Sequence, residues 1–230
     1  MLDKGKSTVY STKREHRSLL FRGGVVLPRD KTDSHIRIIE AARKEFLEYG
    51  YNDASLRRIA ADAGIQVSGL YKHFPNKEEM FSSLVDPAVT GFYKLYHEIE
   101  NEYFDAIDQI ETEYEWEDDG ETVRLMRYVY DHLEEFRLLI MCARGTKYED
   151  FVHEVAGLEE EVTGRYMEEL KGKGCDIKYV DPMEMHLLTS AYVEAVFQPV
   201  THNLDREKAM HFASTLQEFY RPAWKALFGI

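Results

Sequence analysis

The sequence predicts an all-α protein of about nine helices. Apolar residues recur at three- and four-residue steps through most of the 230 residues, which is the period of an amphipathic helix. Residues that favour helix N-termini precede five of these stretches: Ser55, Asn76, Thr146, Asp181 and Asp205. The apolar–polar alternation of a half-buried strand is absent, and β-rich runs are short. These observations exclude a sheet-based fold.

Residues 1–33 carry eight Lys or Arg against four Asp or Glu, and glycines and a proline interrupt their short apolar runs. We expect a flexible basic arm, because neither run is long enough to form a core. Contact of this arm with DNA phosphates is the alternative. The first predicted helix follows at residues 34–50, where Gly50 ends an apolar stripe made of Ile36, Ile39, Ala42, Phe46 and Tyr49.

Residues 55–80 predict two short helices joined by a turn, then the start of a third. Ser55 caps the first of them, and Gly64 supplies the positive φ that ends it. The second runs from about Gln66, packs through Val67, Leu70 and Phe74, and stops before Pro75. A helix too short to be stable alone, held beside another across a Gly turn, is typical of a helix-turn-helix motif.

Three cations of this segment lie in the first turn of a predicted helix: Arg57, Arg58 and Lys77. The helix dipole disfavours a cation there by roughly 0.3–1 kcal/mol. An unfavourable placement that occurs three times suggests an anionic partner, and phosphate fits because helix N-termini also offer free N–H groups. A solvated basic face is the alternative.

The stretch GYNDASLRRIAADAGIQVSGLYKHFPNKEEMF, ending at Phe81, resembles the DNA-binding domain of the TetR family of transcriptional regulators, and the likeness covers about residues 34–81. The most specific part is LYKHFPNKEEMF. The resemblance implies a ligand-relieved repressor that binds a palindromic operator in double-stranded DNA as a homodimer. It also implies a helix-turn-helix domain at 34–80 and a helical effector-binding and dimerisation domain at 81–230. The resemblance does not extend to the arm at 1–33, whose length departs from the family pattern.

By the same resemblance, one set of residues is expected to contact DNA: Ser55, Arg57, Gln66, Val67, Ser68, Gly69, Tyr71, Lys72, His73 and Lys77. Ser55 and Lys77 would bind phosphate, and Gln66 to Gly69 would face the major groove. The apolar period instead turns Val67 towards packing. Gly69 has no side chain to read a base, so sequence specificity would depend on Gln66, Tyr71 and Lys72.

Residues 81–230 predict a long helix to about residue 110 with a kink at Pro87, then helices at 121–144, 146–170, 182–202 and 205–228. The resemblance implies an effector pocket among them. Aromatic and Met residues there suggest a hydrophobic or aromatic ligand, although they could equally be core: Tyr96, Tyr103, Met126, Tyr130, Phe136 and Met141. The last two helices are apolar enough to be core or a subunit interface, and the resemblance favours the interface. Its candidate residues are Leu188, Tyr192, Val196, Leu216, Phe219, Tyr220 and Trp224.

Residues 98–121 hold twelve Asp or Glu and no Lys or Arg. Such a run is typical of a solvated face or loop. The alternative is a cationic effector, attracted by Glu111, Glu113 and Glu115 and by the aromatic faces of Tyr114 and Trp116. A metal-sensing site formed by His186, His202 and His211 is a weaker alternative.

The composition and the absence of known motifs exclude disulfide-rich, membrane-spanning and catalytic proteins. The net charge of −13 is concentrated in residues 81–230, away from the expected DNA surface. Two cysteines give no disulfide framework, and no apolar run is long enough to span a membrane. We expect a cytoplasmic protein without a cofactor, and catalytic motifs are absent. The rival interpretation is a helical module that binds ligand or protein but not DNA.

Overall fold

The computed structural model describes residues 31–109 and 120–229. Within these ranges the chain is all-α, as predicted, and no strand is formed. The helices are α1 (Lys31–Asp53), α2 (Leu56–Asp62), α3 (Val67–Leu70), α4 (Lys77–Gln109), α5 (Glu121–Asp131), α6 (Leu133–Arg137), α7 (Phe151–Gly172), α8 (Pro182–Thr201) and α9 (Arg206–Phe228). A π-helical turn, η1 (Leu138–Cys142), follows α6. The expectations for the 1–33 arm and for Glu111 to Trp116 fall almost wholly outside the described residues.

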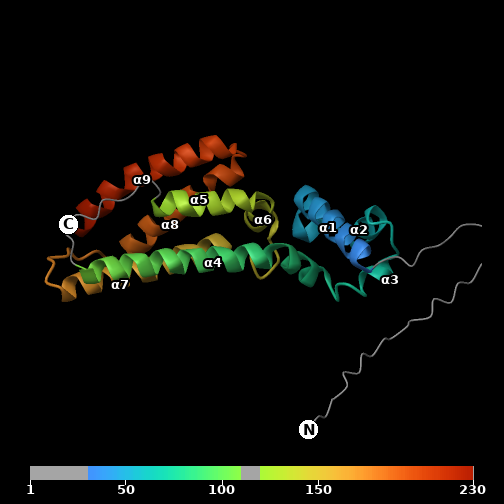
Figure 1. Ribbon diagram of the computed structural model, residues 1–230, viewed down its shortest axis with the longest axis horizontal. Coiled ribbons are helices and arrows are strands. Elements are labelled where there is room, and N and C mark those ends of the chain that lie inside the picture. The colour runs from blue at the N-terminus through green and yellow to red at the C-terminus, as the bar shows by residue number, and fades with distance from the viewer. Residues whose placement is uncertain (1–30, 110–119, 230) are drawn as a thin grey trace, which may run out of the picture.

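The molecule is elongated, with α1–α3 at one end and α5–α9 at the other (Figure 1). Helix α4 joins the two ends. Its 33 residues correspond to about 50 Å at 1.5 Å per residue. Pro87 lies inside α4 and does not end it, so a single helix connects the N-terminal domain to the C-terminal bundle.

The N-terminal domain forms around the apolar side of α1. Ile38, Ala42 and Phe46 repeat at four-residue steps and are fully buried, because that spacing aligns them on one helical face. Gly50 leaves helical geometry with φ +71°, and Gly64 ends α2 with φ +66°. Both glycines were predicted to stop a helix at these positions, where a positive φ favours a residue without Cβ.

Helix α3 is shorter than predicted. Only Val67–Leu70 is α-helical, and Tyr71 to His73 form turns. The N–H groups of His73 and Phe74 both reach the Leu70 carbonyl, at 2.9 and 3.0 Å, so the chain tightens before Pro75. Buried Leu70 and Phe74 hold this short segment against the domain core.

The C-terminal bundle has an aromatic centre. Phe92 of α4 lies 5.6 Å from Phe136 and 5.8 Å from Phe151, centroid to centroid, and 6.1 Å from Phe197 of α8. The predicted caps of the last two helices are confirmed: Asp181 accepts the Met183 N–H, and Asp205 accepts the Lys208 N–H, each at 2.9 Å. Helix α7 begins at Phe151 rather than at Thr146, because Thr146 forms a separate turn with Tyr148.

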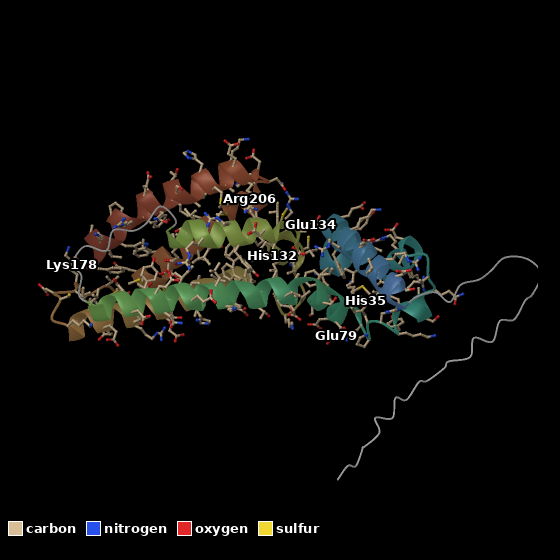
Figure 2. The ribbon with its side chains drawn as sticks, in the orientation of Figure 1. His35, Glu79, His132, Glu134, Lys178 and Arg206 are labelled. Atoms are coloured by element: carbon tan, nitrogen blue, oxygen red, sulfur yellow. The ribbon has the colours of Figure 1, made fainter. Side chains whose placement is uncertain are left out.

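The two ends are tied together at the border of α1 and α6. Arg43 of α1 forms ion pairs with Glu134 at 3.1 Å and Glu135 at 2.6 Å, and Figure 2 shows Glu134 where the bundle meets α1. Nearby, Phe81 of α4 packs on Tyr148, whose hydroxyl is bonded to Asp86. A displacement in the bundle can therefore reach the N-terminal domain through α4 and through this contact.

Candidate functional site

The start of α2 is fixed by Glu45 rather than by its own N-cap residue. Ser55 occupies the N-cap position, but its side chain makes no capping hydrogen bond. Instead Glu45 Oε1 accepts the Ser55 N–H and the Arg58 Nε–H, both at 2.7 Å. Burial opposes ionisation of Glu45, yet these two donors hold its pKa below the ordinary value. The Ser55 hydroxyl is thereby left at the surface of the domain, half-buried.

Two of the three cations that suggested an anionic partner have internal partners. Arg58 pairs with Glu45 and lies over the Tyr49 ring, 4.2 Å from its centroid. Lys77 Nζ donates to the carbonyls of Asn52 and Ala54, both at 3.1 Å, and burial lowers its pKa. In the chain without DNA, the Lys77 ammonium group thus caps the C-terminal end of α1, and its predicted phosphate contact stays a prediction. Arg57 remains exposed.

The other predicted DNA contacts fall into two groups. Gln66, Ser68, Tyr71 and Lys72 are exposed, with half of the Tyr71 surface open to solvent, and Gly69 and His73 are half-buried on the same segment. Val67 packs against the domain core, which is the orientation that the apolar period predicted.

His35 of α1 lies beside this segment and was not anticipated. It is exposed, its ring stacks on Phe74 at 5.2 Å, and the His73 ring lies 5.7 Å away. No sequence signal marked it, because the contact joins residues 38 or more positions apart.

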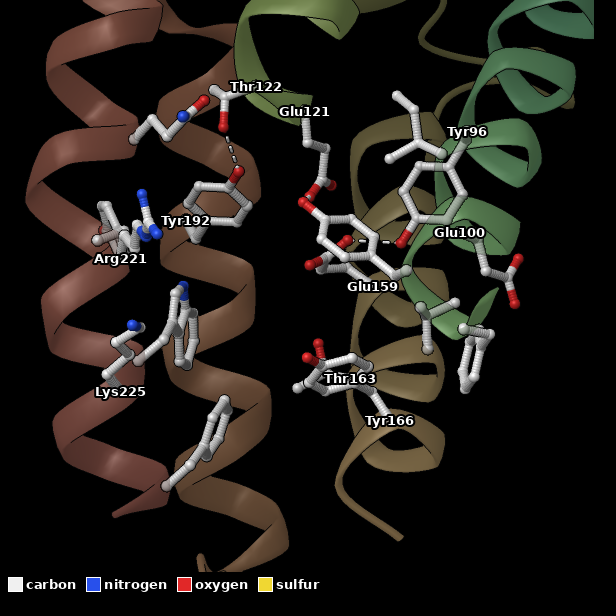
Figure 3. A pocket seen from close by; sticks show the side chains of 18 residues that line it. Tyr96, Glu100, Glu121, Thr122, Glu159, Thr163, Tyr166, Tyr192, Arg221 and Lys225 are labelled. Carbon is white, nitrogen blue, oxygen red and sulfur yellow. Dashed lines mark hydrogen bonds between the residues drawn. The ribbon is translucent and has the colours of Figure 1, made fainter. Parts of the chain in front are cut away.

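A cavity of about 230 Å³ opens in the C-terminal bundle. Helices α4, α5, α7, α8 and α9 all contribute to its wall (Figure 3). Eight aromatic side chains line it: Tyr96, Tyr103, Phe104, Tyr166, Tyr192, Tyr220, Trp224 and Phe228. Polar and charged side chains also line it, and they include Glu121 of α5 and Glu159 of α7.

Both glutamates accept hydrogen bonds from tyrosines of α4. The Tyr103 hydroxyl donates to Glu121 Oε2 at 2.9 Å, and the Tyr96 hydroxyl donates to Glu159 Oε2 at 2.5 Å. Burial, followed by the negative charge of Glu159, raises the pKa of Glu121 to about 8. Burial also raises the pKa of Glu159. On the α8 side, the Tyr192 hydroxyl lies 2.8 Å from Thr122 Oγ1.

The predicted effector residues are only partly brought together. Tyr96 and Tyr103 line the cavity. Met126 and Phe136 are wholly buried in the core, and Tyr130 donates its hydroxyl to the Leu204 carbonyl. Met141 is 52% exposed. These four residues do not line this cavity, because helical period alone does not separate core from cavity wall. Glu121, Glu159 and Tyr192 were missed as cavity residues, although Glu121 ends the acidic run at the start of a predicted helix.

The predicted interface residues also differ in their exposure to solvent. Tyr192, Val196 and Leu216 are buried within the single chain, where they offer little surface to a second subunit. Tyr220 and Trp224 are half-buried and line the cavity. Leu188 is 41% exposed and Phe219 is 70% exposed. Leu187, which was not singled out, is 61% exposed.

Within residues 31–109 and 120–229, no three His, Cys, Asp or Glu side chains are grouped closely enough to hold a metal ion. His186 instead contacts Glu160 at 3.0 Å, and His202 and His211 are exposed. None of the helices in these residues combines the length and apolar character needed to cross a membrane.

The N-terminal domain is similar to known transcriptional regulators. Residues 38–84 match the family of bacterial regulatory proteins named after TetR. An HTH-type transcriptional regulator of Staphylococcus aureus strain bovine RF122 / ET3-1 is 31% identical over 75 residues, and so is one from strain USA300. Each alignment covers 33% of this chain and only 40% of the relative.

The fold is shared over a longer stretch. The structure of NalD, the secondary repressor of the MexAB-OprM multidrug efflux pump in Pseudomonas aeruginosa, superimposes with a TM-score of 0.53. The match covers 82% of this chain and 97% of NalD at 16% identity, so it supports the fold alone. Residues 38–84 are therefore similar to the helix-turn-helix domain of the TetR family of transcriptional regulators, within an all-α fold that this chain shares with NalD.

Proposed function

We propose that this chain is a repressor that binds a palindromic DNA operator as a homodimer and leaves it when a small ligand enters the bundle cavity. The observation that carries this proposal is the course of α4. The helix begins at Lys77, which bonds to the end of α1, and further along its Tyr96, Ile99 and Tyr103 line the cavity. A ligand that shifts α4 would therefore move the helix-turn-helix domain.

DNA recognition would use the exposed side chains of α3 and the turn after it. Gln66 and Lys72 suit the base edges of adenine and guanine respectively. Arg57 and the Ser55 hydroxyl lie at the start of α2, where phosphate contacts are favourable. Tyr71 and His73, with His35 beside them, would border the groove.

A homodimer would present two such surfaces about one helical turn of DNA apart. The exposed apolar residues Leu187 and Leu188 of α8 and Phe219 of α9 support the last two helices as the subunit contact. Large apolar side chains exposed on adjacent helices are typical of such interfaces.

The proposal is tested by electrophoretic mobility of the purified chain on its own upstream region, with scrambled DNA of equal length as the control. We expect a retarded complex with the upstream DNA that the scrambled DNA does not compete away. Equal retardation of both sequences, or none, would refute operator binding. The rival function, a ligand- or protein-binding module without DNA affinity, predicts no retardation at all.

A further inference from the structure

The cavity wall holds the carboxylates of Glu121 and Glu159, besides that of Glu100, which pairs with Arg165. Within residues 31–109 and 120–229, neither Glu121 nor Glu159 forms an ion pair with Lys or Arg. Arg124, whose charge lowers the pKa of Glu121, is itself bound to Glu102. Figure 3 shows Glu121 and Glu159 pointing towards one another from α5 and α7. Two carboxylates in a shared, partly dry site repel each other, and an external cation would relieve that cost.

The walls favour an organic cation over a metal ion. One continuous aromatic group is formed by Tyr192, Tyr220 and Trp224. The ring centroids of Tyr192 and Tyr220 are 5.0 Å apart, and those of Tyr220 and Trp224 are 6.1 Å apart. Aromatic faces attract ammonium groups, whereas the described residues contain no group of three His, Cys, Asp or Glu side chains placed to hold a metal ion. The volume of about 230 Å³ has room for about eight waters at roughly 30 Å³ each, which suits a small ligand.

We propose that this cavity takes a small organic cation with an apolar or aromatic body, whose positive charge lies against the Glu121 and Glu159 carboxylates. The inference rests on the proposed function, because it names the class of ligand that would release the DNA. Arg221 and Lys225 also line the cavity, on the α9 side (Figure 3). Because both side chains are cationic, an anionic ligand is the alternative that the experiment must distinguish from a cationic one.

Binding of a cation would be linked to proton release. Burial raises the pKa values of Tyr96, Tyr103 and Tyr192 far above neutrality, so these phenols stay neutral. The groups that face Glu121 from the surrounding helices are Tyr96, Glu100, Tyr103, Arg124, Glu159, Tyr166, Tyr192, Tyr220, Arg221 and Lys225. Glu121 itself titrates near pH 8. Affinity for a permanently charged cation should therefore rise as the pH increases from about 6 to about 9.

The test uses phenyltrimethylammonium, which cannot lose its charge, and tert-butylbenzene, its neutral isostere, with 3-phenylpropanoate as the anion. Calorimetry and ligand-observed NMR on the full chain at about pH 8 should give at least about tenfold tighter binding of the cation than of either comparator. Glu121→Gln and Glu159→Gln should each weaken the cation by about tenfold or more and leave the neutral isostere unchanged. Glu98→Gln is the control, because Glu98 is exposed on α4, pairs with Lys94 at 3.6 Å and lies outside the cavity wall, and it should change affinity less than about twofold.

Three results would overturn the inference: no cation binding up to about 1 mM, binding of the isostere or the anion as tightly as the cation, or unaltered affinity in both Gln variants. Circular dichroism of each variant separates loss of the fold from loss of the charge. These titrations contain no DNA, so a failure of operator binding would leave their outcome intact. Conversely, a cation that binds without altering DNA affinity would refute ligand-relieved repression and not the chemistry of the cavity.

Discussion

The Tyr103 hydroxyl donates a 2.9 Å hydrogen bond to Glu121 Oε2, which joins the long helix α4 to the first residue of α5. Tyr96, two turns earlier on α4, makes the equivalent bond to Glu159 of α7. The helix that carries the DNA-binding domain at its other end is thus held in the bundle by two carboxylates that line the cavity. A ligand that competes for these carboxylates would act directly on the position of α4.

The buried Glu121 should make the protein less stable at alkaline pH. Its folded-state pKa of about 8 lies above the ordinary value of 4.5, so the folded state binds more protons between these values and stability falls as the pH rises through them. The slope from one such group is up to about 1.4 kcal/mol per pH unit. Denaturant unfolding from pH 5 to pH 9 should give a flatter profile for Glu121→Gln than for the wild type. Identical profiles would show that Glu121 is not buried as described.

Glu45 should stabilise the start of α2. Glu45→Ala removes the acceptor of the Ser55 N–H and of Arg58, and we expect a loss of about 1–3 kcal/mol in unfolding free energy at neutral pH. Because the pKa of Glu45 is lowered, its contribution is present above pH 4.5 and is lost as the pH falls through the folded-state value. Glu40→Ala, at an exposed position of α1, is the control. If Glu45→Ala were as stable as the wild type, Glu45 would not stabilise the start of α2.

Arg43 should hold the two domains together. Arg43→Glu places like charges opposite Glu134 and Glu135, and we expect faster amide hydrogen exchange along the border of α1 and α6. Adding Glu135→Arg should restore protection, since it re-forms the pair with the charges exchanged. Lys44→Glu, next to Arg43 but paired loosely with Asp62 at 3.7 Å, controls for a change in net charge. Unchanged exchange in Arg43→Glu would contradict this role.

Gly91 should be required where α5 packs on α4. A Cβ at this position would lie 2.0 Å from the Tyr128 hydroxyl oxygen and 2.9 Å from Cζ, and would force Tyr128 away from its hydrogen bond to the Ala88 carbonyl. Gly91→Ala should cost about 1–3 kcal/mol. Gly157→Ala in α7 meets nothing within 4 Å and should stabilise by up to about 1 kcal/mol through helix propensity. Thermal unfolding of both variants makes the comparison, and a stabilised Gly91→Ala would contradict the packing.

Phe219 should lie in the proposed subunit interface. Phe219→Glu places a charge at a position 70% exposed in the single chain, so the fold should be kept while a dimer dissociates. Sedimentation velocity should show a shift towards monomer for Phe219→Glu and for Leu187→Glu. Tyr179→Glu, at a residue 80% exposed before α8, should leave the assembly unchanged. A dimer that persists in both interface variants would place the contact elsewhere.

Local features of the fold could be predicted from the sequence. The glycines at 50 and 64 and the caps at Asp181 and Asp205 depend on residues that are neighbours in the chain. The exposed α3 surface, with Gln66 and Lys72, could be anticipated because a short motif fixes it.

Features that depend on tertiary contact could not be predicted. Lys77 had a favourable position for phosphate, but carbonyls some 25 residues earlier bind it instead. Tyr192 belongs to an apolar stripe that fits an interface as well as a core, and only the packing of α5 and α9 against α8 assigns it to the cavity. Glu159 gave no signal, because a single glutamate on a charged helix has no distinctive pattern.

The most direct test of the account is the salt dependence of DNA binding by the full chain. Fluorescence anisotropy with the upstream DNA at about 50 and 200 mM salt should give a Kd that weakens steeply, since each phosphate contact adds about 0.9 to the slope. Lys72→Ala should weaken binding by about 1–3 kcal/mol at one base pair of each half-site. Lys77→Ala should leave the salt slope unchanged, because the Lys77 ammonium group already donates to the carbonyls of Asn52 and Ala54. Salt-independent anisotropy, or wild-type affinity of Lys72→Ala for every operator variant, would contradict DNA recognition through α3.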